Sequence, residues 1–382
     1  MRWAVALLLG GLLATGLASA EGTETADESP VVDRWYFQAE YLVWWLRRDR
    51  VPPLLTTSPA ASQGILGQPG TAIVFPEADG KLESRHDRFV GARFSTGWWF
   101  DDEQELGLQG SGFLLERDSS NFTIKQTPAG ALFARPFTNA TTGGQGSEII
   151  GGPSPGIGDL SGAINAYSRI ELYGEELNLV AAIDREDSWR FDFVAGLRCL
   201  QMRDRFDLTS ASFVLPARST LLADTDHFWT FNKFFGGQIG LSGTYSEGAW
   251  SLNVTASAAV GGNDQEIRTK GDRTVQTPTT KLMQPFGLYV LPTNSGNFER
   301  WAFDAASELR VTLGYDVTSW LRATVGYNFL YWLDPVRAGD QIDAINPAQF
   351  RGVLAGPARP AIPFNEDFFW AQGGDVGLTI RW

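Results

Sequence analysis

Two Asp–His pairs are the residues of this sequence whose types could perform acid–base chemistry. The 382-residue chain contains two histidines, and each stands next to an aspartate, in His86–Asp87 and Asp226–His227. An imidazole that is positioned by a carboxylate can activate water for hydrolysis. Adjacent residues of a strand point to opposite faces, however, so neither pair forms a dyad by itself. We interpret both pairs as rim residues of strands and keep a hydrolase as the third-ranked hypothesis.

A short segment with three oxygen-bearing side chains is the nearest approach to a metal site. Asp340, Asp343 and Asn346 could offer oxygens to a divalent cation, but their spacing matches no standard calcium loop. The sequence has no phosphate-binding loop, dinucleotide fingerprint or paired Cys/His site, and Cys199 is its one cysteine. We therefore expect no metal, no cofactor and no catalytic residue. The net charge of -13 argues against nucleic acid as a partner.

Charged residues of both signs fall on the polar side of segments that alternate between apolar and polar residues. If that side faces the lumen of a barrel, ten charged residues line it: Glu40, Arg93, Glu176, Arg190, Asp192, Arg198, Asp304, Glu308, Arg310 and Arg322. Two interpretations stay open. The charges either fill a narrow lumen as salt bridges, or they border a hydrated channel with weak ion preference.

The alternating segments themselves predict β-strands. The clearest one runs from Trp301 to Asp316, with apolar residues at nearly all odd positions and polar or small ones at even positions. A strand with this pattern has one face suited to hydrocarbon and one face that is not. Similar segments occur at 35–46, 90–100, 189–199, 250–260 and 321–331, and a further segment ends at Trp382. Two further segments, 106–114 and 167–183, are weaker, and a change of apolar parity near Gly174 predicts a β-bulge.

The connections between these segments alternate between long and short. Short polar turns are expected at 101–104, 184–188, 246–248 and 316–319, and long irregular stretches at 47–85, 127–165, 208–224, 269–297 and 334–367. Outer-membrane barrels have short periplasmic turns and long extracellular loops. Five long and four short connections predict an all-β, transmembrane, antiparallel up-and-down barrel of about ten strands, or twelve if 114–125 hides a hairpin. The loop 127–165 is our candidate for a constriction.

The first residues have the features of a signal peptide. A basic start precedes an apolar run from Ala4 to Leu17, and Ala-Ser-Ala precedes Glu21. We therefore expect a cleaved signal peptide at 1–20, a flexible periplasmic leader at 21–33 and a barrel at 34–382, in the outer membrane.

Aromatic residues are abundant, at 13% of the chain with 14 Trp, and those near strand ends are expected to contact lipid at the membrane interfaces. Six are assigned there: Trp45, Trp250, Tyr315, Trp320, Trp332 and Trp382. Tyr315, Trp320 and Trp382 belong to the periplasmic girdle, and Trp45 and Trp332 approach the outer one. The terminal strand with its final Trp382 resembles the signal that such proteins present to the barrel-assembly machinery. The expected partners are therefore outer-membrane lipid and that machinery.

Eight different short motifs occur, each once, along nearly the whole mature chain. They are WYFQAEYLVWWL with the following PPLLTTS, GARFSTGWWFD, ARPF, LYGEELN, FVAGLR, FWTFNKFFGGQIGL, GYNFLYW and RAGDQID. Together they resemble the planctomycete-type outer-membrane proteins called the putative β-barrel porin-7 family, with one departure at Ala338, where proline is expected. The resemblance implies an outer-membrane barrel and no particular substrate. Our first functional hypothesis is a porin that passes small solutes or ions passively, and the alternative is a structural or adhesive protein with a side-chain-filled lumen.

Overall fold

The computed structural model describes residues 33–76, 88–125 and 132–382. The predicted signal peptide, nearly all of the predicted leader and the His86–Asp87 pair lie outside these ranges. The described residues form a sheet of 16 strands and short 3-10 helices. Among them, no helix is long and apolar enough to span a membrane.

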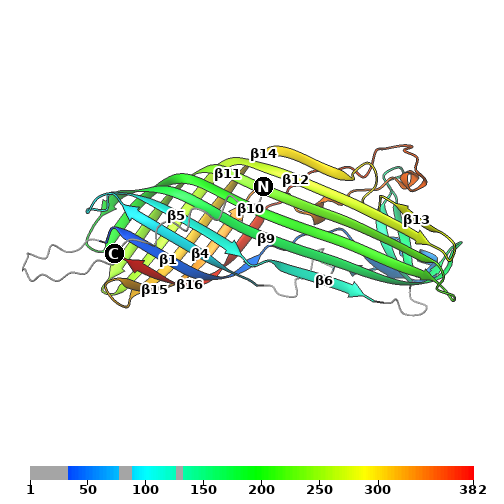
Figure 1. The fold of residues 1–382 in the computed structure, drawn as a ribbon, viewed down its shortest axis with the longest axis horizontal. Coiled ribbons are helices and arrows are strands. Elements are labelled where there is room, and N and C mark those ends of the chain that lie inside the picture. The colour runs from blue at the N-terminus through cyan, green and yellow to red at the C-terminus, as the bar shows by residue number, and fades with distance from the viewer. Residues whose placement is uncertain (1–32, 77–87, 126–131) are drawn as a thin grey trace, which may run out of the picture. The chain divides into compact units, whose positions relative to one another are not determined.

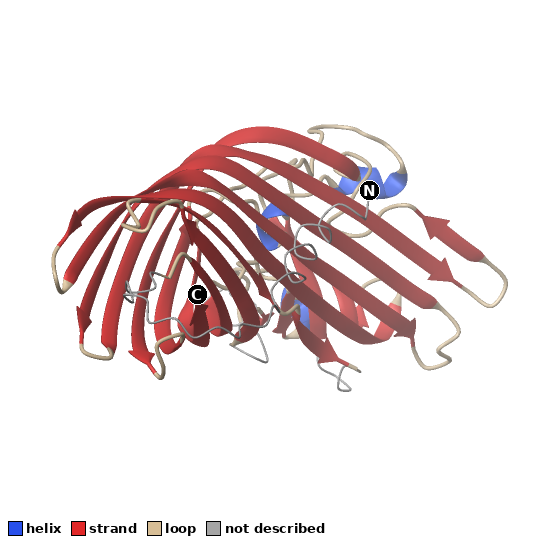
Figure 2. Ribbon diagram, turned by 60° about the vertical axis from the view of Figure 1, so that its left-hand side comes forward, coloured by secondary structure: helices blue, strands red, loops and turns tan. Residues whose placement is uncertain are grey.

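Ten strands form a closed antiparallel ring, which is the barrel (Figures 1 and 2). Each strand pairs with the next, and the last returns to the first. The prediction of an up-and-down barrel of about ten strands is confirmed. The strands are β1 (Trp35–Leu46), β4 (Phe89–Trp99), β5 (Leu106–Leu115), β9 (Gly158–Arg185), β10 (Trp189–Val214), β11 (Leu221–Glu247), β12 (Trp250–Gln276), β14 (Gly296–Asp316), β15 (Leu321–Trp332) and β16 (Phe369–Arg381).

The seam between the first and last strands closes the ring. β1 and β16 pair continuously from Tyr36↔Arg381 to Leu46↔Ala371. Beyond them, the Trp35 N–H donates to the Trp382 carbonyl at 2.9 Å, and the Trp382 N–H donates to the Trp35 carbonyl at 3.0 Å. A closed ring leaves no unpaired strand edge, which is what a sheet surrounded by hydrocarbon requires.

The outer face of the ring carries an apolar belt. On β11, for example, Phe235, Ile239 and Leu241 are exposed and alternate with the inward-facing Gly236, Gln238 and Gly240. Paired aromatic rings border the belt at the end with the short turns: Trp35–Trp98 at 5.3 Å, Trp189–Tyr245 at 4.7 Å and Trp250–Tyr315 at 4.8 Å between centroids. Both described chain ends lie at this end, which is periplasmic by the usual topology of such barrels.

Strands β9 to β12 are 26 to 28 residues long. A membrane-crossing strand needs only about 9–11 residues. The excess continues beyond the belt as a four-stranded extension on the extracellular side (Figure 2). Three long loops were predicted where strands of the extension in fact lie. The prediction is therefore partly wrong for 127–165, 208–224 and 269–297. Strand β6 (Asp118–Ile124) pairs with β9 in this extension and adds no hairpin to the ring.

The extension explains the change of apolar parity near Gly174. In the belt, Leu177 and Leu179 of β9 point outward, whereas in the extension Ile164 and Leu172 point inward and are buried. Even-numbered residues face inward throughout, and β9 pairs with β10 without a shift past Gly174. The apolar side changes because the medium outside the sheet changes from hydrocarbon to water. The bulge prediction at Gly174 is wrong, and the register shift lies at Phe191/Asp192.

Extracellular segments fold against the inner face of the extension, and we call this assembly the head. Its core joins Phe206 and Phe228 of the extension to loop residues such as Leu54, Leu288 and Ile345. The head contains β2 (Leu55–Ser58), β3 (Ala72–Phe75), β7 (Leu132–Thr138), β8 (Gln145–Ser154), β13 (Lys281–Gln284), and the 3-10 helices η1 (Ala60–Ser62), η2 (Gly339–Gln341) and η3 (Pro347–Arg351). The segment 127–165, our candidate for a constriction, contributes β7 and β8 to this head, outside the membrane-spanning part of the ring.

Candidate functional site

The lumen of the ring contains three successive layers, which together form the candidate site. A polar vestibule occupies the periplasmic end. Next comes an ionic layer, made of Glu40, Arg93, Glu176, Arg198, Glu308, Arg310 and Asp375. On the extracellular side of the ionic layer, still inside the lumen, lies an apolar layer, made of Leu42, Trp44, Phe113, Leu200, Met202, Phe234, Leu330, Trp332 and Phe369.

The ionic layer spans the lumen from wall to wall. Arg93 of β4 contacts Glu308 of β14 at 2.7 Å, and Arg198 of β10 pairs with the same carboxylate. Arg310 of β14 reaches Glu176 of β9 at 3.1 Å. In each of these three ion pairs the two residues come from strands that are not neighbours in the ring, so each pair crosses the interior. The Arg93 and Glu308 side chains are only 2% and 3% exposed.

Amide side chains complete this layer. Arg93 donates to Asn328 Oδ1 at 2.7 Å, and Asn328 donates to Asp375 Oδ2 at 2.6 Å. Gln238 donates to Glu176 at 3.0 Å. Buried charges are tolerated when they are paired and hydrogen-bonded. The layer therefore holds most of its charged side chains in a network of ion pairs and hydrogen bonds that crosses the lumen.

The apolar layer closes the lumen on the extracellular side of the ionic layer. The rings of Trp44 and Phe113 lie 5.2 Å apart, and those of Phe234 and Trp332 lie 6.3 Å apart. The Arg93 guanidinium lies 5.5 Å from both the Trp44 and the Phe113 ring, which joins the two layers. Large side chains from opposite walls thus fill the cross-section.

The structure places all ten predicted charged residues on the inner face, but not in one cluster. Glu40, Arg93, Glu176, Arg198, Glu308 and Arg310 form the ionic layer. Arg190 pairs with Asp192 at 2.8 Å in the vestibule, where Arg322 pairs with Asp316 at 2.7 Å. Asp304 lies deeper, beside the apolar layer, and accepts a hydrogen bond from Trp332 Nε1 at 2.7 Å.

Five of the six predicted interface aromatics are exposed on the outer face: Trp45, Trp250, Tyr315, Trp320 and Trp382. Trp332 is the exception, because it is 0% exposed and points into the lumen. Its even position gives it the same side of β15 as Arg322 and Asn328, so the alternation that assigned those residues inward should have assigned Trp332 inward too.

The Asp226–His227 pair is split between the two faces of β11. Asp226 is fully buried in the head, where it pairs with Arg135 at 2.5 Å and accepts hydrogen bonds from the backbone N–H groups of Tyr289 and Val290. His227 points outward and bonds Asp207 through Nδ1 at 2.7 Å. Asp226 therefore fastens a loop, and the two side chains form no dyad.

The predicted oxygen cluster at 340–346 is also divided among separate tasks. Asp343 pairs with Arg359 at 2.6 Å, and Asn346 caps η3 by accepting from the Ala348 N–H. Across residues 33–76, 88–125 and 132–382, no group of three or more His, Cys, Asp or Glu side chains is arranged to hold a metal ion.

Two ionic clusters of the head were missed by the sequence reasoning. In one, Arg135 and Arg273 face Glu148, Asp224 and Asp226. Burial and the neighbouring Asp224 raise the pKa of Glu148 to about 7. In the other, Arg337 pairs with the fully buried Asp204 at 2.7 Å, and Asp49 accepts from the Gly339 N–H at 2.9 Å. The motif RAGDQID, which contains Arg337, was the one available signal for the second cluster.

Comparisons with solved structures find outer-membrane barrels of low similarity. The outer membrane protease OmpT from Escherichia coli has a TM-score of 0.40 at 10% identity, with 94% of this chain and 100% of that chain covered. The P. putida toluene transporter TodX has a TM-score of 0.21 at 8% identity, with 92% and 90% covered. No curated protein matches.

A comparison with protein-family models shows the family of this chain, which the weakly similar solved structures do not. The model described as "Putative beta barrel porin-7 (BBP7)" matches residues 36–382, which is nearly all of the barrel and head. The match covers every strand of the ring except the first residue of β1. This chain belongs to the Putative beta barrel porin-7 family.

Proposed function

We propose that this protein is a closed outer-membrane barrel whose role is to anchor and present the extracellular head. The observation that carries the proposal is the pair of stacked layers, ionic and apolar, that fill the lumen inside the membrane-spanning part of the ring. A lumen of ten strands has little spare room once large inward side chains occupy it. The head is the part of the described chain that a partner outside the cell would meet.

Family membership and the apolar belt support an outer-membrane location. We further propose that residues 1–20 are removed as a signal peptide during export, that residues 21–33 remain as a periplasmic leader, and that the terminal strand engages the barrel-assembly machinery. Sequencing the N-terminus of protein purified from outer membranes tests the first point. A mature chain beginning near Glu21 is the expected result.

A porin is the second candidate, and one observation favours it. The vestibule is polar and opens toward the periplasm, so half of a solute path already exists. Passage would require the ionic and apolar layers to separate. The proposed anchoring role requires no separation of these layers.

Single-channel recording separates the two candidates. The refolded mature chain, shown to be folded by its heat-modifiable gel mobility, is expected to give no conductance steps in a planar bilayer. The triple variant Trp44→Ala, Phe113→Ala, Trp332→Ala, which empties much of the apolar layer, is expected to conduct more often than the wild type. Regular steps from the wild-type protein would overturn the anchor and support the porin.

The hydrolase hypothesis has its own test. If the His/Asp pairs carried catalysis, replacing both His86 and His227 would abolish any hydrolytic activity of the purified protein. The separation of Asp226 from His227 supports the opposite expectation, that the double variant behaves like the wild type.

A further inference from the structure

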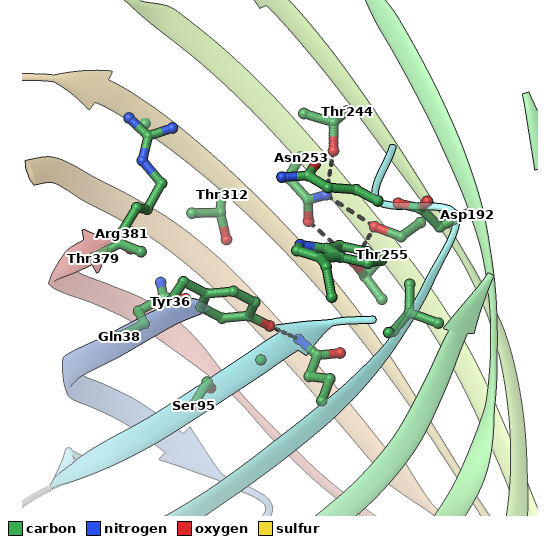
Figure 3. A pocket seen from close by; sticks show the side chains of 18 of the residues that line it. Tyr36, Gln38, Ser95, Asp192, Thr244, Asn253, Thr255, Thr312, Thr379 and Arg381 are labelled. Carbon is green, nitrogen blue, oxygen red and sulfur yellow. Dashed lines mark hydrogen bonds between the residues drawn. The ribbon is translucent and has the colours of Figure 1, made fainter. Parts of the chain in front are cut away.

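The vestibule is a cavity of about 360 Å³ at the periplasmic end of the lumen (Figure 3). This volume lies at the lower end of the range for small-molecule pockets, roughly 300–1,000 Å³. Strands from all around the ring line it, and its floor is the ionic layer, reached at Glu40 and Arg310. A molecule in the periplasm can therefore enter the vestibule but meets a closed floor.

One wall of the vestibule is a self-contained hydrogen-bond network. Asn253 donates to Ser242 at 2.9 Å and to Thr244 at 2.8 Å, and Thr255 donates to Asn253 at 3.0 Å (Figure 3). These groups satisfy one another and keep this wall in a fixed shape.

The vestibule also carries hydroxyls that this network does not use. Ser251, Thr312 and Thr379 line the vestibule, and their hydroxyls make no hydrogen bond to another described residue. Tyr36 adds a fourth hydroxyl, which accepts from Gln109 at 2.7 Å and keeps its own hydrogen for donation. Rigid strands hold all four groups, so they are available to a ligand at fixed positions.

Tyr36 also offers an aromatic surface. A Cβ atom at Gly97 would lie 2.1 Å from the Tyr36 ring, so the absence of a side chain at Gly97 lets the ring lie close against β4. Figure 3 shows the ring extending into the cavity. A flat ring beside several hydroxyls suits a ligand that has both C–H faces and hydroxyl groups.

Most of the charged groups that line the vestibule are already paired. Arg190 pairs with Asp192, and both Arg322 and Arg381 pair with Asp316, the latter at 2.9 Å. Arg310 is held by Glu176. A charged ligand would have to break one of these pairs, whereas a neutral ligand would not.

We propose that the vestibule binds a neutral, hydroxyl-rich small molecule from the periplasm, of which a monosaccharide or disaccharide is the type. The unused hydroxyls supply the hydrogen bonds, Tyr36 supplies the stacking surface and the paired charges exclude ions. This inference does not depend on whether the lumen conducts, because the site lies entirely on the periplasmic side of the ionic layer.

Saturation-transfer NMR on the folded, detergent-solubilised full mature chain tests the proposal with glucose, maltose and glucuronate as probes. Glucose or maltose is expected to saturate the site, and glucuronate to bind at least tenfold more weakly. The double variant Thr312→Val, Thr379→Val keeps the side-chain shapes and removes two hydroxyls. It is expected to bind the neutral sugar roughly tenfold more weakly, as the loss of two neutral hydrogen bonds implies.

Two further variants keep the test interpretable. Thr312→Ser, Thr379→Ser retains both hydroxyls and is expected to retain binding. Thr274→Val, a change of the same kind in the extracellular part of β12, is expected to have no effect. The proposal is overturned if no neutral sugar saturates the folded wild type, if the double valine variant binds as well as the wild type, or if glucuronate binds as well as glucose.

Discussion

At the scale of single residues, the lumen is governed by the need to pair buried charges. Arg93 has three kinds of partner at once: the Glu308 carboxylate, the Asn328 amide and the faces of two aromatic rings. Removing one member of such a network leaves the others buried without compensation. The consequence should be visible as a loss of stability.

We predict that Arg93→Met lowers the free energy of unfolding by about 3–5 kcal/mol, because Asn328 then loses its donor and the buried Glu308 carboxylate keeps only Arg198 as an ionic partner. Urea titration of the folded protein in lipid vesicles measures the change. The control is Arg34→Met, which removes an exposed ion pair with Asp102 and is expected to cost about 0–1 kcal/mol. Equal effects of the Arg93 and Arg34 substitutions would contradict the role of the ionic layer.

At the scale of elements, each long strand meets two different media, and this governs what the sequence could predict. In the belt, alternation marks the outward side, so ten strands and their order could be read from segments such as 301–316. In the extension, the same alternation marks the inward side. The four long strands of the extension therefore looked like loops, and Gly174 looked like a bulge.

The candidate site was predictable to a lesser degree, for a related reason. Parity alone identified the charged residues of the inner face, because it needs no knowledge of partners. The pairing of Arg93 with Glu308 joins residues 215 positions apart, and the tie between Arg135 and Asp226 depends on how the head loops fold. Nothing in local spacing encodes such contacts.

The two media give a prediction for substitutions on β11. Ile239→Arg places a charge on the lipid-facing side and is expected to destabilise the inserted barrel by about 2–4 kcal/mol near the membrane midplane. Phe228→Arg places a charge in the core of the head and is expected to leave the barrel inserted while the head becomes protease-sensitive. Heat-modifiable mobility reports the barrel, and limited proteolysis of whole cells reports the head. If Phe228→Arg prevented insertion as strongly as Ile239→Arg, head and barrel would not be separable in this way.

Strands β7 and β8 give a prediction about pH. Glu148 of β8 faces Arg135, Arg273, Asp224 and Asp226, and its pKa is raised from 4.5 to about 7. Between these two values the folded state binds more protons than the unfolded state, so the contribution of Glu148 to stability falls as pH rises toward 7. Local opening of the β7–β8 hairpin, measured by hydrogen exchange corrected for the intrinsic pH dependence, is expected to be more frequent at pH 8 than at pH 5. Glu148→Gln should remove this difference, and a pH dependence that persists in the variant would refute the assignment.

At the scale of the whole molecule, a single seam makes the sheet into a closed ring. The last residue takes part directly, because the Trp382 backbone both donates to and accepts from Trp35, and its carbonyl also accepts from Arg34. The indole of Trp382 is exposed on the outer face. Backbone and side chain therefore serve two different purposes at this position.

We predict that deleting Trp382 reduces the amount of heat-modifiable barrel in outer membranes several-fold, because closure hydrogen bonds and the terminal aromatic are lost together. Trp382→Ala keeps the backbone bonds and isolates the contribution of the side chain, which includes its proposed recognition by the assembly machinery. Trp320→Ala, which removes an exposed aromatic at a nearby turn, serves as the control. An unchanged yield for the deletion would show that neither contribution matters.

The same seam sets the order in which this chain can fold. Residues 35 and 382 are almost as far apart in sequence as the chain permits, and contacts of such long separation form slowly. The hairpins of β9 to β12 join neighbours and can form early, but both free edges persist until the final strand has been exported. A chain that is cut short anywhere before residue 369 never loses those edges. Truncated products of this gene should therefore aggregate or be degraded in the periplasm, rather than accumulate as smaller barrels.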